Sequence, residues 1–349
     1  MNKNIFYTDM KRRICFFLTI LIITLIVFAA EACTNKDISV KSSNFSKNDN
    51  QTTHDSVLID GKEIKSALAV ETFLADIAQN VTNSRLEIYS LIPIGIDPHE
   101  FEPVPGDFAK ISKNKILIIN GSGFEGWLEQ MLKNAGSNNY IIEASKGLEK
   151  IVDFQSENNS EDNKTSENEK GPSGIDPHFW LDPVYAIEYV KNISSELIKI
   201  DPDSKDIYET NAQKYIADLK GLDEWIKSRV NILPESKKLL VTNHESLGYF
   251  AKRYGFKIVG TIIPGFSTDA SITAKEFAGL INAVRSSGVK VIFLETGSNP
   301  NLAEQLAAET GIKVVYNLYT HSLSGPDGEA STYINMMKFN VNTIVNNLQ

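Results

Sequence analysis

Residues 95–103 of this 349-residue chain read GIDPHEFEP, and residues 174–183 read GIDPHFWLDP, so the pentapeptide GIDPH occurs twice. The chain contains only five histidines, and the repeat uses two of them, His99 and His178. In each copy a proline biases the preceding aspartate toward an extended conformation, which stiffens the approach to the histidine. We interpret the two segments as loops of one shape, each of which presents an imidazole.

Short apolar runs alternate with helical patterns around these loops. Predicted strands cover residues 66–71, 86–92, 115–121 and 139–145 in the first half, and 237–243, 256–263, 289–295 and 312–318 in the second half. Helical patterns lie at 107–112, 124–136, 274–288 and 301–311, and the last three end at Gly136, Gly288 and Gly311, as helix C-caps favour. This alternation predicts an α/β fold with two similar lobes, each built on a mainly parallel four-stranded sheet.

One long helical pattern separates the two groups of strands. It runs over residues 203–234, with Asp203 as the predicted cap and Pro234 at its end. Its apolar residues recur close to helical spacing, at Ile207, Tyr215, Leu219, Leu222, Ile226 and Val230. A helix of nearly thirty residues is about 40 Å long. We therefore predict a rigid linking helix between an N-terminal lobe (58–202) and a C-terminal lobe (235–349); packing into one lobe alone is the alternative.

The N-terminus has the pattern of a secretory signal. Lys11, Arg12 and Arg13 precede an apolar run over residues 14–30, and small residues stand just before Cys33. We predict a lipoprotein signal peptide over residues 1–32, cleavage before Cys33 and a lipid on its sulfur. The protein would then be extracytoplasmic and anchored to the outer face of the bacterial cell membrane. An uncleaved membrane anchor is the alternative.

Two stretches are too polar to bury a core: residues 33–57, which we predict to be a flexible tether, and the acidic loop 153–173. His54 lies in the tether, where we expect it to be solvated. The two cysteines are Cys15, inside the signal, and Cys33, so any metal site of the mature domain must use His, Asp or Glu. A net charge of −9 argues against nucleic acid as a partner.

The remaining four histidines are candidate metal ligands. His99, His244 and His321 follow predicted strands, where open α/β sheets bind ligands, and His178 precedes a helix predicted to begin near Asp182–Pro183. Four neutral imidazoles satisfy a tetrahedral Zn²⁺, which we expect in the cleft between the lobes. Nearby carboxylates could orient the imidazoles without binding the metal themselves; the candidates are Asp97, Asp176, Glu102, Asp182 and Glu245.

Longer motifs carry a resemblance to a known family. PIGIDPHEFEPVPGDFAKIS, NGSGFEGWLEQML, DPHFWLDPVYA, TNHESLGYFAKRYGF, LAAETGIKVV and SGPDGEASTYINMMKFNV resemble the solute-binding lipoproteins of bacterial zinc and manganese ABC importers, known as cluster A-I. The similarity covers roughly residues 67–348. It implies two α/β lobes joined by one long rigid helix with a metal between them, and it places the family's first three ligands on His99, His178 and His244.

The chain departs from the family pattern at two places. The family's fourth ligand is commonly an aspartate in a TDSL-like stretch, but this chain reads THSL and places His321 there. Zinc-specific members often carry a histidine-rich loop before the second DPH motif, whereas residues 153–174 contain no histidine.

The resemblance implies a component that captures Zn²⁺ and delivers it to a membrane permease and its cytoplasmic ATPase, with Mn²⁺ or iron as the alternative ion. We expect a monomer without enzymatic activity. The other classes are a zinc hydrolase, with Glu245 or Glu295 as general base, and a surface adhesin. A fourth histidine would close the coordination shell, the chain has no HExxH motif, and nothing in the sequence singles out an adhesive surface.

Overall fold

The computed structural model describes residues 57–59, 62–136, 138–150 and 174–349, and two four-stranded parallel sheets organise them. The N-terminal sheet has the order β4-β3-β5-β6, with β3 (Ser66–Ala69), β4 (Glu87–Ser90), β5 (Ile116–Ile119) and β6 (Tyr140–Glu143). The C-terminal sheet has the order β10-β9-β7-β8, with β7 (Leu239–Thr242), β8 (Lys257–Thr261), β9 (Val291–Glu295) and β10 (Lys313–Leu318). All eight predicted strands are present and pair in parallel, which confirms the predicted α/β class.

Helices connect the strands of each sheet. The N-terminal lobe contains α2 (Thr72–Thr82), α3 (Pro105–Lys113), α4 (Leu128–Ala135) and α6 (Pro183–Ile200), and the C-terminal lobe contains α8 (Gly248–Tyr254), α9 (Ala274–Ser287), α10 (Asn301–Thr310) and α11 (Tyr333–Leu348). The predicted C-caps are confirmed, because Gly136, Gly288 and Gly311 have φ values of 56°, 74° and 75°. The predicted start of α6 is also confirmed: Pro183 is its first residue, and the Asp182 side chain accepts a hydrogen bond from Val184 N.

One small element was not predicted. β1 (Val57–Ile59) pairs antiparallel with β2 (Lys62–Ile64), at the point where the expected tether meets the N-terminal lobe. The predicted signal peptide 1–32, Cys33, the rest of the tether up to residue 56 and the polar loop 153–173 lie outside the described residues. Within the described ranges, no helix combines the length and the apolar character that crossing a bilayer requires.

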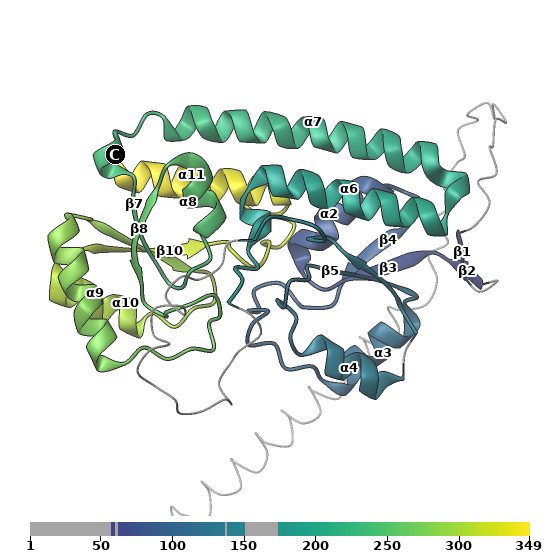
Figure 1. Cartoon of the computed structure of the whole chain (residues 1–349), viewed down its shortest axis with the longest axis horizontal. Helices are drawn as coiled ribbons and strands as arrows, with labels where there is room; N and C mark the ends of the chain where they lie inside the picture. The colour runs from purple at the N-terminus through teal and green to yellow at the C-terminus, as the bar shows by residue number, and fades with distance from the viewer. Residues whose placement is uncertain (1–56, 60–61, 137, 151–173) are drawn as a thin grey trace, which may run out of the picture. The chain divides into compact units, whose positions relative to one another are not determined.

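The long helix α7 (Lys205–Val230) contacts both lobes, so its packing into one lobe alone is excluded. Figure 1 shows α7 running past both sheets, with α2 and α6 beside one half and α11 beside the other half. The predicted apolar stripe faces inward, and its buried members are Tyr215, Leu219, Leu222, Ile226 and Val230. Asp203 is not the cap: a 3-10 turn, η3 (Pro202–Ser204), precedes the helix because Ser204 N bonds to Asp201 O, and Ser204 takes the N-cap position.

The apolar core beneath α7 is continuous from one lobe to the other. One cluster of buried residues includes Ala67 of the N-terminal sheet and Phe293 of the C-terminal sheet, together with the inner faces of α2, α6, α7 and α11. Aromatic side chains close the junction, and the Phe179 and Tyr249 rings stack with centroids 4.7 Å apart. Because a close-packed interior resists shear, this shared core holds the lobes in a fixed relation.

An ion pair between the half-buried Arg253 of α8 and the buried Asp223 of α7 joins the two helices. The Arg253 guanidinium donates two hydrogen bonds of 2.7 Å to the two oxygens of Asp223, and Tyr254 donates a third of 2.9 Å. Burial opposes ionisation of Asp223, but these bonds and a bond from Lys227 prevail and lower the pKa of Asp223 to about 2. The pair therefore stabilises the junction between the linking helix and the C-terminal lobe.

We predict that Asp223→Asn lowers the free energy of unfolding at pH 7 by about 1–2 kcal/mol. The folded pKa of about 2 lies below the ordinary value of 3.8, so this contribution is complete above pH 3.8 and is lost as the pH falls toward 2. Urea unfolding at a series of pH values should show the two proteins converging in acid. Asp218→Asn, at an exposed position on the same helix, is the control; an Asp223→Asn deficit that does not depend on pH contradicts the assignment.

Candidate metal centre

The four predicted ligands lie beyond the carboxyl ends of strands or at the start of a helix. His99 lies in the loop after β4, His244 follows β7, and His321 follows β10. His178 comes directly before the 3-10 turn η2 (Phe179–Leu181), which leads into α6. The two lobes therefore contribute two histidines each, and the cluster forms where the lobes face each other.

The two GIDPH loops share a local structure. In the first loop, Asp97 Oδ1 accepts a hydrogen bond of 2.9 Å from His99 N, and in the second, Asp176 Oδ1 accepts one of 2.9 Å from His178 N. This is an Asx-turn, in which an aspartate fixes the backbone two residues ahead of it. The similarity of the two loops, predicted from the repeat, is therefore found in their backbone bonding.

The four imidazoles converge through their Nε2 atoms. His178 Nε2 lies 3.3 Å from His99 Nε2, 3.2 Å from His244 Nε2 and 3.2 Å from His321 Nε2. All four potential ligand atoms lie within 4.8 Å of one another, and among the residues that the structure describes no carboxylate joins this cluster. In a tetrahedral zinc site with Zn–N bonds of about 2.0–2.1 Å, neighbouring nitrogens are about 3.3–3.4 Å apart. The spacing around His178 thus fits a single ion bound by four imidazoles.

Burial keeps most of the cluster in the neutral form that binds metals. His178 and His244 are fully buried, and His321 is 7% exposed. Burial, followed by repulsion from neighbouring histidines, lowers the pKa of His99 and His178 well below the ordinary value. Burial also lowers the pKa of His321. His244 differs: burial acts to lower its pKa, but Glu295, with smaller contributions from Asp97 and Glu245, outweighs burial, and the pKa of His244 is raised.

Buried carboxylates contact the outward-facing nitrogens. Asp176 Oδ1 lies 2.8 Å from Nδ1 of His178, as anticipated among the orienting candidates. Burial raises the pKa of Asp176 well above its ordinary range, and a dication at Nε2 would favour its ionised form. Asp97 contacts the backbone of His99, and Asp182 caps α6, so neither contact reaches a ring nitrogen.

Glu295 also contacts the proposed ligands, although the sequence did not predict it as an orienting residue. The sequence suggests Glu295 only as a general base, yet its carboxylate lies 2.9 Å from Nδ1 of His244 and 3.5 Å from Nδ1 of His321. Burial opposes its ionisation, but His244 and His321 prevail and lower the pKa of Glu295 to about 2. Its position at the end of β9, beside the strands that precede both histidines, is the signal that was available.

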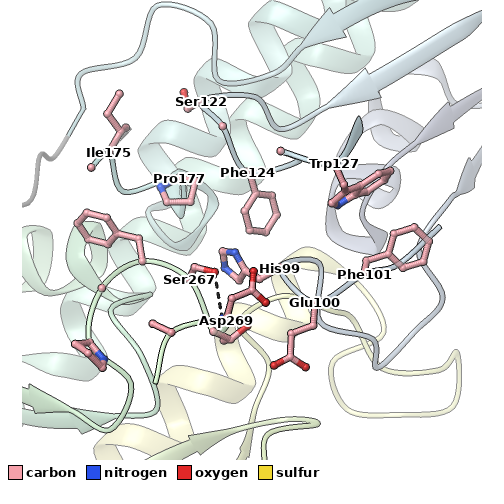
Figure 2. Close-up of a pocket in the computed structure, with 18 of the residues that line it drawn as sticks. His99, Glu100, Phe101, Ser122, Phe124, Trp127, Ile175, Pro177, Ser267 and Asp269 are labelled. Atoms are coloured by element: carbon pink, nitrogen blue, oxygen red, sulfur yellow. Dashed lines mark hydrogen bonds between the residues drawn. The ribbon is translucent and has the colours of Figure 1, made fainter. Parts of the chain in front are cut away.

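A cleft of about 1190 Å³ leads to the cluster. Of the four histidines only His99 lines it, together with carboxylates at Glu100, Glu102 and Asp269. Figure 2 shows His99 between the loops of the two lobes, with Phe124 above it, and the two rings meet edge to face at 4.9 Å. The other three imidazoles lie behind His99, so the cleft reaches the cluster at this residue.

Hydrogen bonds between the lobes fix the His321 loop. Leu323 N donates to Thr72 Oγ1 at 2.8 Å, and Gly95 N donates to Ser322 Oγ at 2.8 Å. Trp180 Nε1 also donates to Thr320 O at 2.7 Å. His321, although part of the C-terminal lobe, is thereby positioned by the lobe that carries His99 and His178.

Residues 68–347 match the family described as zinc-uptake complex component A, periplasmic. The chain belongs to this family. It is accordingly a substrate-binding protein of a metal ABC transporter, a class that is not enzymatic, and the zinc hydrolase alternative is wrong.

Relatives and solved structures agree with this assignment. The manganese-binding lipoprotein MntA of Halalkalibacterium halodurans is 29% identical over 97% of this chain and 99% of its own length. The manganese ABC transporter substrate-binding lipoprotein PsaA of Streptococcus pneumoniae is 31% identical over 80% of this chain and 88% of its own. The Mn-bound periplasmic metal binding protein of Candidatus Liberibacter asiaticus is 28% identical, with a TM-score of 0.69 over 82% of this chain and all of its own. The periplasmic zinc binding protein TroA of Treponema pallidum, 21% identical over 82% of this chain and 99% of its own, shares the fold with a TM-score of 0.70.

We predict that metal binding produces no large rotation of the lobes, because the shared core and the hydrogen bonds around the His321 loop already fix them. Small-angle scattering of protein stripped with a chelator and of protein loaded with Zn²⁺ should give superimposable curves. A change that requires one lobe to rotate as a rigid body contradicts the prediction.

Proposed function

We propose that this protein captures Zn²⁺ outside the cytoplasm and delivers it to the permease of its importer, with His99, His178, His244 and His321 as the ligands. The observation that carries the proposal is the convergence of four Nε2 atoms, with spacings of 3.2–3.3 Å around His178. These spacings match the edge of a tetrahedral Zn–N₄ site.

The donor set favours zinc over manganese. Imidazole is a good ligand for Zn²⁺, whereas Mn²⁺ favours carboxylate, carbonyl and water oxygens. Within the described part of the chain, the cluster offers four imidazoles and no carboxylate. Manganese remains the alternative cargo because MntA and PsaA are named for it. Elemental analysis of the protein purified from its native host decides between the two ions.

The proposal includes the location and state of the protein. Cys33 would carry the lipid that holds the protein at the outer face of the membrane, and the relatives MntA and PsaA are named as lipoproteins. A single-chain monomer would present its cleft to the permease, and the ATPase would act from the cytoplasm. Each lobe supplies two of the four ligands, so a single chain completes the site.

We predict that His321→Asp reduces the preference for Zn²⁺ over Mn²⁺, mainly because a carboxylate oxygen improves Mn²⁺ binding. Loss of a residue that only hydrogen-bonds to a metal ligand weakens binding by roughly 10–100-fold. His321→Ala removes a proposed ligand, so it should weaken Zn²⁺ binding by more than that. Competition with a chromophoric chelator measures both affinities. His54→Ala, at the fifth histidine, is the control and should leave both affinities unchanged. If His321→Ala binds Zn²⁺ as tightly as the native protein, the four-histidine site is wrong.

We predict that Cys33→Ser releases the protein from the membrane without altering metal affinity, because the anchor and the ligands are separate residues. Cell fractionation follows the location, and mass spectrometry of the native N-terminus detects the lipid on the sulfur. A Cys33→Ser protein that stays with the membrane after detergent-free washing supports an uncleaved anchor instead.

A further inference from the structure

The Glu295 side chain lies between the two histidines of the C-terminal lobe, on the side away from the converging Nε2 atoms. Oε1 is 2.9 Å from Nδ1 of His244, and Oε2 is 3.5 Å from Nδ1 of His321. Ser246 Oγ donates a hydrogen bond of 2.8 Å to Oε1. The residue is 4% exposed, so water does not screen its charge from the two rings.

We infer that Glu295 is a positioning residue, which orients the imidazoles of His244 and His321 so that their Nε2 atoms face the ion. Its negative charge, outside the coordination shell, also favours binding of a dication. The inference rests on the proposed function and deepens it. A carboxylate cannot donate a hydrogen bond, so its charge favours a proton on the Nδ1 that lies near it. This preference is stronger for His244, at 2.9 Å, than for His321, at 3.5 Å, whose Nδ1 also lies 3.3 Å from Thr320 Oγ1. In a neutral ring with the proton on Nδ1, the lone pair is on Nε2, where the ion would bind.

Geometry excludes Glu295 as a ligand in its own right. Among the described residues, the group of potential ligand atoms within 4.8 Å of one another consists of the four histidines. The oxygens of Glu295 contact the far nitrogens of two of these rings and the Ser246 hydroxyl. The carboxylate therefore lies beside the Nδ1 atoms and not among the converging Nε2 atoms, where it could attract a bound ion but not coordinate it.

The charge has a specific consequence. Four neutral imidazoles add no charge to a bound dication, and burial of an uncompensated charge is unfavourable. The carboxylate of Glu295 is buried and lies beside two of the four rings, 2.9 Å from Nδ1 of His244 and 3.5 Å from Nδ1 of His321. Glu295 thus offsets one positive charge of the ion while offering it no oxygen ligand.

Among the described residues, the N-terminal lobe shows a matching carboxylate contact on the ring of His178 and none on the ring of His99. Asp176 lies 2.8 Å from Nδ1 of His178, whereas Asp97 bonds to the backbone N of His99. Glu295 is distinctive because a single side chain lies beside two ligands. Its removal should therefore disturb half of the site at once.

The test is Glu295→Gln, which keeps the shape of the side chain but removes its charge and places an NH₂ donor where one oxygen was. We expect Zn²⁺ affinity to fall on the order of 10–100-fold in chelator competition. In the chelator-stripped protein, ¹⁵N shifts of the imidazoles should show His244 or His321 moving from the Nδ1–H tautomer to a mixture. Glu295→Asp, which retains the charge, should recover part of the affinity. Glu125→Gln removes another buried glutamate, one that accepts hydrogen bonds from Asn120 N and Gly121 N, and is the matched control.

The outcomes separate this inference from the proposed function. If the native protein fails to bind Zn²⁺ through its histidines, the proposed function is wrong. If the native protein binds as proposed but Glu295→Gln keeps its affinity within about twofold and its imidazole ¹⁵N shifts, only the role of Glu295 is overturned. A loss of affinity that Glu295→Asp does not recover, and that Glu125→Gln reproduces, shows a purely structural effect and also overturns it.

Discussion

The structure depends on holding two lobes at one fixed separation, because four nitrogens from separate loops must meet at a single point. His178 Nε2 lies within 3.2–3.3 Å of its three counterparts, and two of those three come from the other lobe. The continuous core beneath α7 and the hydrogen bond from Leu323 to Thr72 fix this separation. The ordering needed for binding therefore occurs when the protein folds, which leaves little conformational entropy to lose when an ion arrives.

The same rigidity determines which of the four histidines is accessible from the cleft. His178 and His244 are fully buried, while His99 lines the cleft and has no carboxylate contact at its ring among the described residues. Three of the four proposed ligands are therefore enclosed by protein, and the fourth, His99, faces the cleft. Since the lobes are held together by a shared core, we expect exchange of an ion at the proposed site to depend on local motion around His99 more than on separation of the lobes.

The sequence was informative wherever a local rule decides the structure. Strand and helix alternation, the glycine C-caps and Pro183 at the start of α6 all follow from backbone preferences, and the structure agrees with each. The repeated pentapeptide predicted two similar loops, but it did not predict that Asp176 reaches a ring while Asp97 does not, because burial and ring orientation depend on distant residues. Glu295 was not predicted as an orienting residue for the same reason. It ends β9, and the histidines beside it follow β7 and β10, strands that are distant in the sequence.

In the proposed site, charge and ligand type are supplied by different residues. A carboxylate inside the coordination shell attracts a dication but also gives Mn²⁺ the hard oxygen that it prefers. With Glu295 behind His244 and His321, the attraction persists at low dielectric while the ion contacts nitrogen alone. A histidine at position 321 and a buried acid at position 295 are therefore complementary. The imidazole excludes the oxygen ligand, and the glutamate supplies the charge that a carboxylate ligand would have brought.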